Sequence, residues 1–98
     1  METSNKIIKM NISGIEIINR IAGIYRLNLP LEIVRLAYDK EADVLTAHFV
    51  DKLNVVDSEI VEENDNIILG LNSSDAIERI TILNASKFTW KIKQPSNQ

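Results

Sequence analysis

Tyr38-Asp39-Lys40-Glu41-Ala42-Asp43-Val44-Leu45 links two apolar runs through a polar turn, and the same pattern repeats along the chain. Short apolar runs bounded by polar residues are typical of strands. Breaks of four or five residues favour antiparallel neighbours, because parallel strands need crossovers of a dozen residues or more. The sequence therefore predicts an antiparallel β-meander of about five strands within residues 31–93. The expected strands are Leu31–Tyr38, Val44–Val50, Val55–Val61, Ile67–Leu71 and Ala76–Leu83.

A strand and a helix are expected in front of the meander. Lys6–Ile12 alternates apolar and polar residues, which is the period of a half-buried strand. Gly14–Leu27 places apolar residues at helical spacing, and Pro30 disfavours helical geometry at the residue before it. We therefore predict an α+β fold in which the N-terminal strand and this amphipathic helix pack on one face of the sheet.

The chain length allows one domain, because 98 residues are close to the usual size of an independently folding unit. We expect a single domain over residues 1–98, made of a strand–helix extension (1–30), the meander (31–93) and a frayed tail (94–98). Asn84–Phe88 fits a helical turn with Asn84 as its N-cap. The alternation of Phe88, Trp90 and Ile92 fits one more strand equally well, so both interpretations stay open.

The octapeptide at 38–45 resembles the signature of a family of small prokaryotic proteins known as domain of unknown function 2283, whose members carry Tyr-Asp-x-Glu-Ala-Asp-x-Leu. Ser58-Glu59 and Ile82-Leu83-Asn84-Ala85-Ser86-Lys87 agree with it, so the resemblance covers roughly residues 34–88. The Asp-Gly turn that the family usually has before its last strand is replaced by Asn72-Ser73-Ser74-Asp75. The resemblance implies a small β-rich fold and no established activity. Because some members are encoded beside genes for ribonuclease-like toxins, it also implies an antitoxin-like or partner-binding role.

The net charge of −3 conceals an uneven distribution. Residues 1–38 carry +2, residues 39–86 carry −8, and residues 87–98 carry +3. An acidic segment attracts basic partners over long range. We therefore expect a non-enzymatic protein-interaction module that binds a basic protein. The expected partner-binding residues are Asp39, Glu41, Asp43, Asp57 and Glu59.

The first acidic turn is a candidate metal site. Asp39, Glu41 and Asp43 lie at alternate positions, as at the start of a calcium loop, but Val44 stands in place of the required glycine and Val50 in place of the bidentate glutamate. The chain has no cysteine, which excludes disulfides and thiolate metal sites. We predict no metal and no cofactor, and interpret Asp39 as the cap of an Asx-type turn.

His48, the single histidine of the chain, is the centre of an alternative hypothesis. In it the protein is small-ligand-binding or hydrolytic, with Tyr38 and His48 as ligand-binding residues and Asp57 and Ser58 on a neighbouring strand as orienting acid and nucleophile. No nucleophile elbow or glycine-rich oxyanion loop accompanies them. The sequence therefore does not favour an enzyme.

Nucleic acid, a membrane and a second copy of the chain are the remaining partner classes. A strand followed by a helix is the order in which ribbon–helix–helix repressors begin, so a DNA binder is a further alternative, but the acidic middle segment would repel phosphate. No apolar run approaches the roughly 20 residues that span a bilayer, and we expect a cytoplasmic protein without a membrane partner. A sheet with one helix leaves its second face to cover, which predicts a homodimer.

Overall fold

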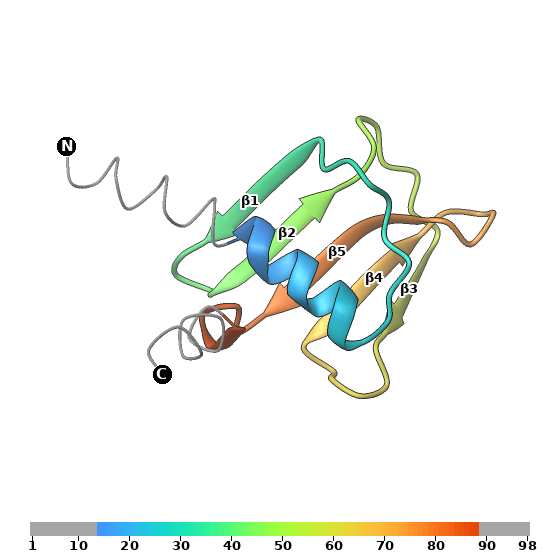
Figure 1. Ribbon diagram of the computed structural model, residues 1–98. Coiled ribbons are helices and arrows are strands. Elements are labelled where there is room, and N and C mark those ends of the chain that lie inside the picture. The colour runs from blue at the N-terminus through green and yellow to red at the C-terminus, as the bar shows by residue number, and fades with distance from the viewer. Residues whose placement is uncertain (1–13, 89–98) are drawn as a thin grey trace.

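The computed structural model describes residues 14–88, which form a five-stranded antiparallel sheet, a helix over residues 14–24 and a helical turn at 86–88 (Figure 1). The antiparallel sheet and the α+β class expected from the sequence are confirmed. The strands are β1 (Arg35–Asp39), β2 (Val44–His48), β3 (Asp57–Ile60), β4 (Ile67–Leu71) and β5 (Ile77–Leu83).

The strand boundaries depend on partners as well as on apolar pattern. β4 has the predicted bounds, and β5 begins one residue later than predicted. β1 begins at Arg35 rather than Leu31, because its pairing with β2 starts at Arg35 opposite His48, the last residue of β2. Leu31 is apolar but fully exposed. An apolar run becomes a strand only where another backbone satisfies its hydrogen bonds.

The order of the strands corrects the predicted meander. The sheet runs β1-β2-β5-β4-β3, so β2 pairs with β5 and not with β3. The meander prediction is wrong because the link between β2 and β3 covers the eight residues 49–56, twice the polar break seen in the sequence. Eight extended residues reach about 26 Å, whereas three strand spacings need only about 14 Å.

The crossover of residues 49–56 is held in place by Glu78 on β5. Its Oε1 accepts a hydrogen bond from the backbone N–H of Asn54 at 2.7 Å, and its main-chain oxygen accepts one from Phe49 at 2.9 Å. Its Oε2 accepts a bond from the Asn72 side chain at 2.8 Å. One buried carboxylate therefore fastens the crossover to the β4–β5 turn.

One face of the sheet carries the core. Alternate residues of the central strand β5 are buried, and Leu45 and Ala47 of β2 are buried with them. Ile17, Ile18 and Ile21 of the helix, each no more than 2% exposed, belong to the same hydrophobic cluster. Figure 1 shows the helix crossing that face of the sheet. The apolar stripe found in the sequence is thus the buried side of the helix.

The helix ends earlier than the predicted Leu27. Residues 25–26 form a turn in which the N–H of Leu27 bonds to the carbonyl of Ala22 at 2.9 Å, and Arg26 takes a φ of 56°. A bond across five residues beside a left-handed residue is the Schellman ending of a helix, where glycine is usual. The chain therefore stops the helix with a strained arginine.

The turn after β5 corrects the role predicted for Asn84. A helical turn is present at 86–88, but Asn84 has a φ of 55° and its side chain donates to Asn66 Oδ1 at 3.2 Å. An N-cap residue has extended backbone instead. The cap comes from Asp43, whose Oδ1 accepts from the backbone N–H of Ser86 at 3.0 Å. The prediction of Asn84 as the N-cap is wrong because Asp43, 43 positions from Ser86, folds onto this turn and caps it.

Three of the predicted features lie outside the described residues. They are the strand Lys6–Ile12, the alternation continuing to Ile92, and the tail at 94–98. The assignment of residues 1–98 to one domain stays a prediction.

Candidate partner-binding site

β3 is one edge of the sheet, and all four of its residues are exposed. In its register with β4, Asp57 lies opposite Leu71 and Glu59 lies opposite Leu69. Paired residues of neighbouring strands point to the same face. Both carboxylates therefore stand on the face where Leu69 and Leu71 are buried.

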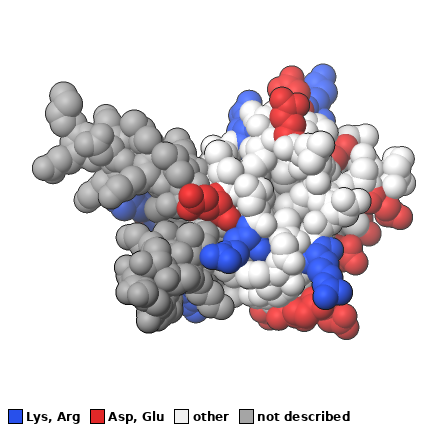
Figure 2. All heavy atoms as spheres, viewed as in Figure 1, with Lys and Arg blue, Asp and Glu red and all other residues white. Residues whose placement is uncertain are grey.

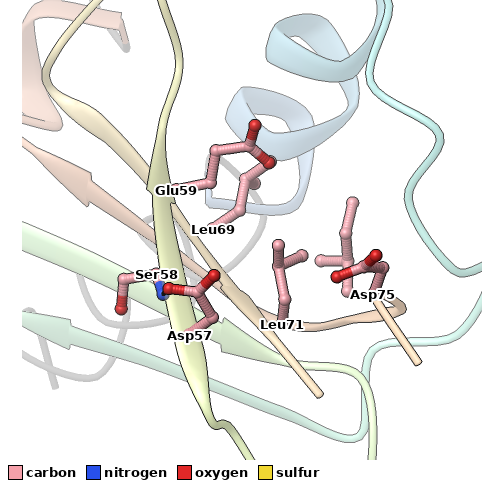
Figure 3. Close-up of a pocket in the computed structure, with 7 residues that line it drawn as sticks. Asp57, Ser58, Glu59, Leu69, Leu71 and Asp75 are labelled. Carbon is pink, nitrogen blue, oxygen red and sulfur yellow. Dashed lines mark hydrogen bonds between the residues drawn. The ribbon is translucent and has the colours of Figure 1, made fainter. Parts of the chain in front are cut away.

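A hollow of about 470 Å³ opens beside this edge. Figure 3 shows Asp57 and Asp75 on either side of Leu71, with Glu59 beside Leu69. The lining residues are Asp57, Ser58, Glu59, Leu69, Leu71, Asp75 and Ile77. The hollow thus combines an apolar floor of three aliphatic side chains with three carboxylates at its rim.

This combination suits a long basic side chain. Lysine and arginine lay their methylene stems on apolar surface and keep the charged head in polar surroundings. Exposed ion pairs contribute only about 0–1 kcal/mol each, so the apolar floor has to supply part of any affinity. Val56 and Ile60, which are 62% and 57% exposed, alternate with the two carboxylates and point to the other face of the sheet.

Asp57 also protects the edge strand. Its Oδ1 accepts a hydrogen bond from the backbone N–H of Ser58 at 2.9 Å. An unpaired N–H on an edge strand otherwise invites another strand to add on. The hollow is therefore better suited to recognition by side chains than to strand addition at Ser58.

Asp75 owes its position to the β4–β5 turn. The Asn72 side-chain oxygen accepts bonds from the N–H groups of Ser74 at 2.8 Å and Ala76 at 3.0 Å. Asp75 takes a φ of 65°, which aspartate tolerates better than most residues. Glu78 holds the other end of Asn72, and hydrogen bonds from Asn54 and Asn72 keep the pKa of Glu78 below its ordinary value.

The other predicted partner-binding residues lie elsewhere. Asp39 ends β1, and Glu41 and Asp43 lie in the turn between β1 and β2. β1 and β3 are opposite edges of the sheet. Four strand spacings separate the two edges, about 19 Å. The structure therefore brings Asp57 and Glu59 together and separates them from the other three.

Two of those three carboxylates have internal partners. Asp39 Oδ1 accepts from the N–H groups of Glu41 at 3.1 Å and Ala42 at 3.2 Å, which confirms the predicted Asx-type turn. Asp43 accepts from the Tyr38 hydroxyl at 2.6 Å and from the Ser86 hydroxyl at 2.7 Å. Glu41 is exposed at the same turn.

The Tyr38–Asp43 hydrogen bond changes the titration of both groups. It is the largest cause that raises the pKa of Tyr38 to about 12. Burial raises the pKa of Asp43, but the bonds from Tyr38 and Ser86 outweigh it and leave that pKa below its ordinary value. Asp43 therefore remains a charged acceptor inside a hydrogen-bond network.

The site proposed around His48 is not assembled. Tyr38 pairs with Leu45 on the core face, whereas His48 lies one position out of phase on the other face, opposite Arg35. Asp57 and Ser58 are on the far edge strand, beyond β5 and β4. The structure does not bring these residues together as ligand-binding or catalytic partners. Within residues 14–88, no three histidine or acidic side chains are grouped closely enough to hold a metal ion.

Asp75 and the aliphatic floor were missed from the sequence. Asp75 lies in a polar turn, and nothing in the sequence around it indicates that this turn folds beside β3. Leu69 and Leu71 resemble ordinary core residues of a strand, since nothing in their spacing reveals that they form the floor of a hollow.

Figure 2 shows acidic side chains along the lower and right-hand rim of the helix face, where Figure 1 places the β3–β4 and β4–β5 turns. In the part of the chain that the structure covers, no helix has the length and apolar character needed to cross a membrane.

The fold and the acidic edge define a small α+β protein with one five-stranded antiparallel sheet. The chain belongs to the family described as Protein of unknown function (DUF2283), whose model matches residues 35–86. The family resemblance expected from the sequence is therefore confirmed. No curated protein and no solved structure matches the chain.

Proposed function

We propose that this protein is a non-enzymatic interaction module whose acidic hollow binds a basic side chain of a protein partner. The observation that carries the proposal is the grouping of Asp57, Glu59 and Asp75 around an apolar floor beside an exposed edge strand. This grouping replaces the broader acidic surface predicted from the sequence. Asp39 and Asp43 serve the fold instead.

The surrounding charge supports rapid encounter with such a partner. Glu62, Glu63 and Asp65 lie in the β3–β4 turn, where all three are exposed. Charges at the rim of an interface raise the association rate and make it fall with salt, and they contribute less to the lifetime of the complex. The hollow is then the point of contact and the β3–β4 turn a source of attraction.

An RNA-cleaving protein is one basic partner of this kind, and the chain then acts as an antitoxin-like subunit. The family resemblance is the support for this choice. A cytoplasmic location is part of the proposal, because a ribonuclease meets its substrate there.

A homodimer is also proposed, through the end of the second sheet face that carries Val44 and Leu83, four residues or about 13 Å along β2 from His48. Val44 and Leu83 are paired across β2 and β5 on that face and are half-buried. They give a second copy an apolar point of contact. Light scattering at micromolar concentration is expected to give twice the monomer mass, and a monomer there would contradict this part.

The proposed function is tested by capture with three matched baits. The baits are the natural chain, the hollow variant (Asp57→Asn, Glu59→Gln, Asp75→Asn) and the turn variant (Glu62→Gln, Glu63→Gln, Asp65→Asn). Both variants lose three charges, and asparagine keeps the bond to Ser58 and the left-handed turn position.

We expect one basic protein from the native cell extract to be retained by the natural chain and the turn variant, and lost by the hollow variant. Equal retention by the hollow variant, or equal loss from both variants, would show that the hollow does not recognise the partner.

A further inference from the structure

The face of the sheet opposite the helix carries a line of three basic residues, here called the cationic row (Arg35, His48 and Arg79). Arg35 of β1 is paired with His48 of β2, and His48 is paired with Arg79 of β5. The line continues on β4, where Gly70 is paired with Arg79. Residues paired across antiparallel strands have their Cβ atoms only about 5 Å apart. Three adjacent strands therefore present basic groups side by side.

The row lies away from the core. Ala47 and Ile80, the chain neighbours of His48 and Arg79, are fully buried on the core face. Successive side chains of a strand point to opposite faces. His48 and Arg79 are accordingly on the second face, where both are half-buried, and Arg35 is exposed beside them.

The guanidinium of Arg79 lies over Gly70 of β4. A Cβ atom at Gly70 would lie 3.2 Å from Nε and 3.3 Å from Nη2 of Arg79, and 3.1 Å from Cγ2 of Val55. The missing side chain of Gly70 thus leaves room for the guanidinium to lie against the β4 backbone, beside Val55 of the crossover. The terminal nitrogens of Arg79 are held toward β4 while Arg35 remains on the opposite side of His48.

The row has no acid beside it on the strands. Among the described strand residues of this face, Asp39 is the single carboxylate, and it lies four residues from Arg35, about 13 Å along β1. Its Oδ1 is bonded to the turn. The charged groups that act on His48 are Arg35 from β1 and Arg79 from β5, and burial together with these two arginines lowers the pKa of His48.

Arg35 and Arg79 flank His48 on both sides, so a proton on the imidazole is repelled by both guanidinium groups. A chain with eleven acids between residues 39 and 86 nevertheless places two arginines around its one histidine. An anion over the row would offset this repulsion, and guanidinium groups bind phosphoryl oxygens through two parallel hydrogen bonds.

We propose that the cationic row binds a ligand with two linked phosphoryl groups. Two strand spacings, about 10 Å, separate the backbones of Arg35 and Arg79. The position of the Arg79 guanidinium over Gly70 keeps it away from the guanidinium of Arg35. A single phosphate reaches one arginine and His48, whereas a diphosphate reaches both arginines with His48 as a donor between them. The site is on the opposite face from the acidic hollow and does not depend on the partner proposed for it.

Titration of the full chain with inorganic diphosphate and inorganic phosphate, followed by NMR of the arginine and histidine side chains, tests this site. We expect saturable shifts at all three residues of the row, with diphosphate binding at least about tenfold more tightly than phosphate, since it adds a charge-assisted contact. Equal affinity for the two anions would contradict the spacing argument. Shifts that do not saturate would remove the site.

Single substitutions distinguish binding at the cationic row from non-specific attraction of anions by positive charge. Arg35→Gln and Arg79→Gln are each expected to weaken diphosphate binding about tenfold, whereas Lys52→Gln, which removes a charge from the crossover, leaves it unchanged. Gly70→Ala keeps every charge and is expected to weaken binding by displacing the Arg79 guanidinium. Arg35 is exposed on an edge strand, so its variant tests the site even if an Arg79 variant folds poorly. Affinity that neither arginine variant changes would overturn the proposal.

Discussion

The hydroxyl of Tyr38 donates a 2.6 Å hydrogen bond to Oδ1 of Asp43, and the same carboxylate binds the backbone and the hydroxyl of Ser86. These contacts join the first hairpin to the turn that follows the last strand. Tyr38 and Asp43 belong to the string by which the sequence resembles its family. Two positions of the family string therefore hold this chain's first hairpin against its last turn.

Replacing Asp43 by alanine is expected to lower the free energy of unfolding by about 2 kcal/mol, because hydrogen bonds to a charged acceptor are lost and their donors are left without it. Asp43→Asn should cost less, since asparagine keeps one acceptor and tolerates the φ of 57° at this position. Urea denaturation measures both. Glu41→Ala, an exposed change in the same turn, is the control and should stay within about 0.5 kcal/mol of the natural chain. An Asp43→Ala variant as stable as the control would show that the hydrogen bonds of Asp43 do not stabilise the fold.

The raised pKa of Tyr38 predicts a distinct alkaline titration. The folded pKa of about 12 exceeds the ordinary value of 10.0, so folding favours the protonated hydroxyl. The resulting stabilisation is fully present below the ordinary pKa of 10.0 and is lost as the pH rises through about 12. Absorbance of tyrosinate should show one tyrosine titrating near pH 12 in the folded chain, and Tyr38→Phe should abolish that step. A step that persists in the variant belongs to another group.

Glu78 should make the crossover sensitive to acid. Its folded pKa is below 4.5, so its contribution to stability is present above that pH and is lost as the pH falls through the folded value. Glu78→Gln should flatten this part of the pH profile of stability and speed hydrogen exchange at the amide of Asn54, which then lacks its charged acceptor. Glu62→Gln, at an exposed turn, should change neither. Unchanged exchange at Asn54 in the Glu78→Gln variant would contradict the anchoring role.

Arg26→Gly should stabilise the protein. The left-handed conformation at the helix end costs arginine about 1–2 kcal/mol, and glycine adopts it without that strain but loses part of the gain to backbone entropy. The expected net increase is about 0.5–1 kcal/mol by urea denaturation. A decrease would mean that the Arg26 side chain makes a contribution larger than its backbone strain.

The strands were largely predictable because each is a short apolar run between polar turns, and β4 was located to the residue. Their order was not. Polar residues mark where the chain leaves one strand, but they do not reveal that Val55 and Val56 belong to a crossover and not to the next strand. The buried carboxylate of Glu78 on β5 fixes this route, and its hydrogen-bond partners Asn54 and Asn72 lie 24 and 6 positions away.

The candidate site was half predictable for a similar reason. Asp57 and Glu59 stood out as acids in an expected strand. Asp75 lines the same hollow only because the β4–β5 turn lies beside β3. Asp43 is not part of the hollow, and its carboxylate accepts a hydrogen bond from the distant Ser86. Charge can be counted along a sequence, whereas the partner of each charge depends on the fold.

Recognition of a basic partner by the hollow beside β3 is a matter of binding affinity. Its most direct measurement is the dissociation constant of the captured partner for the natural chain, the hollow variant and the turn variant at one salt concentration. We predict about a tenfold weakening for the hollow variant, the sum of several exposed charge contacts of up to about 1 kcal/mol each, and less than about a threefold change for the turn variant. Equal weakening of the two variants, or none in the hollow variant, would contradict the account.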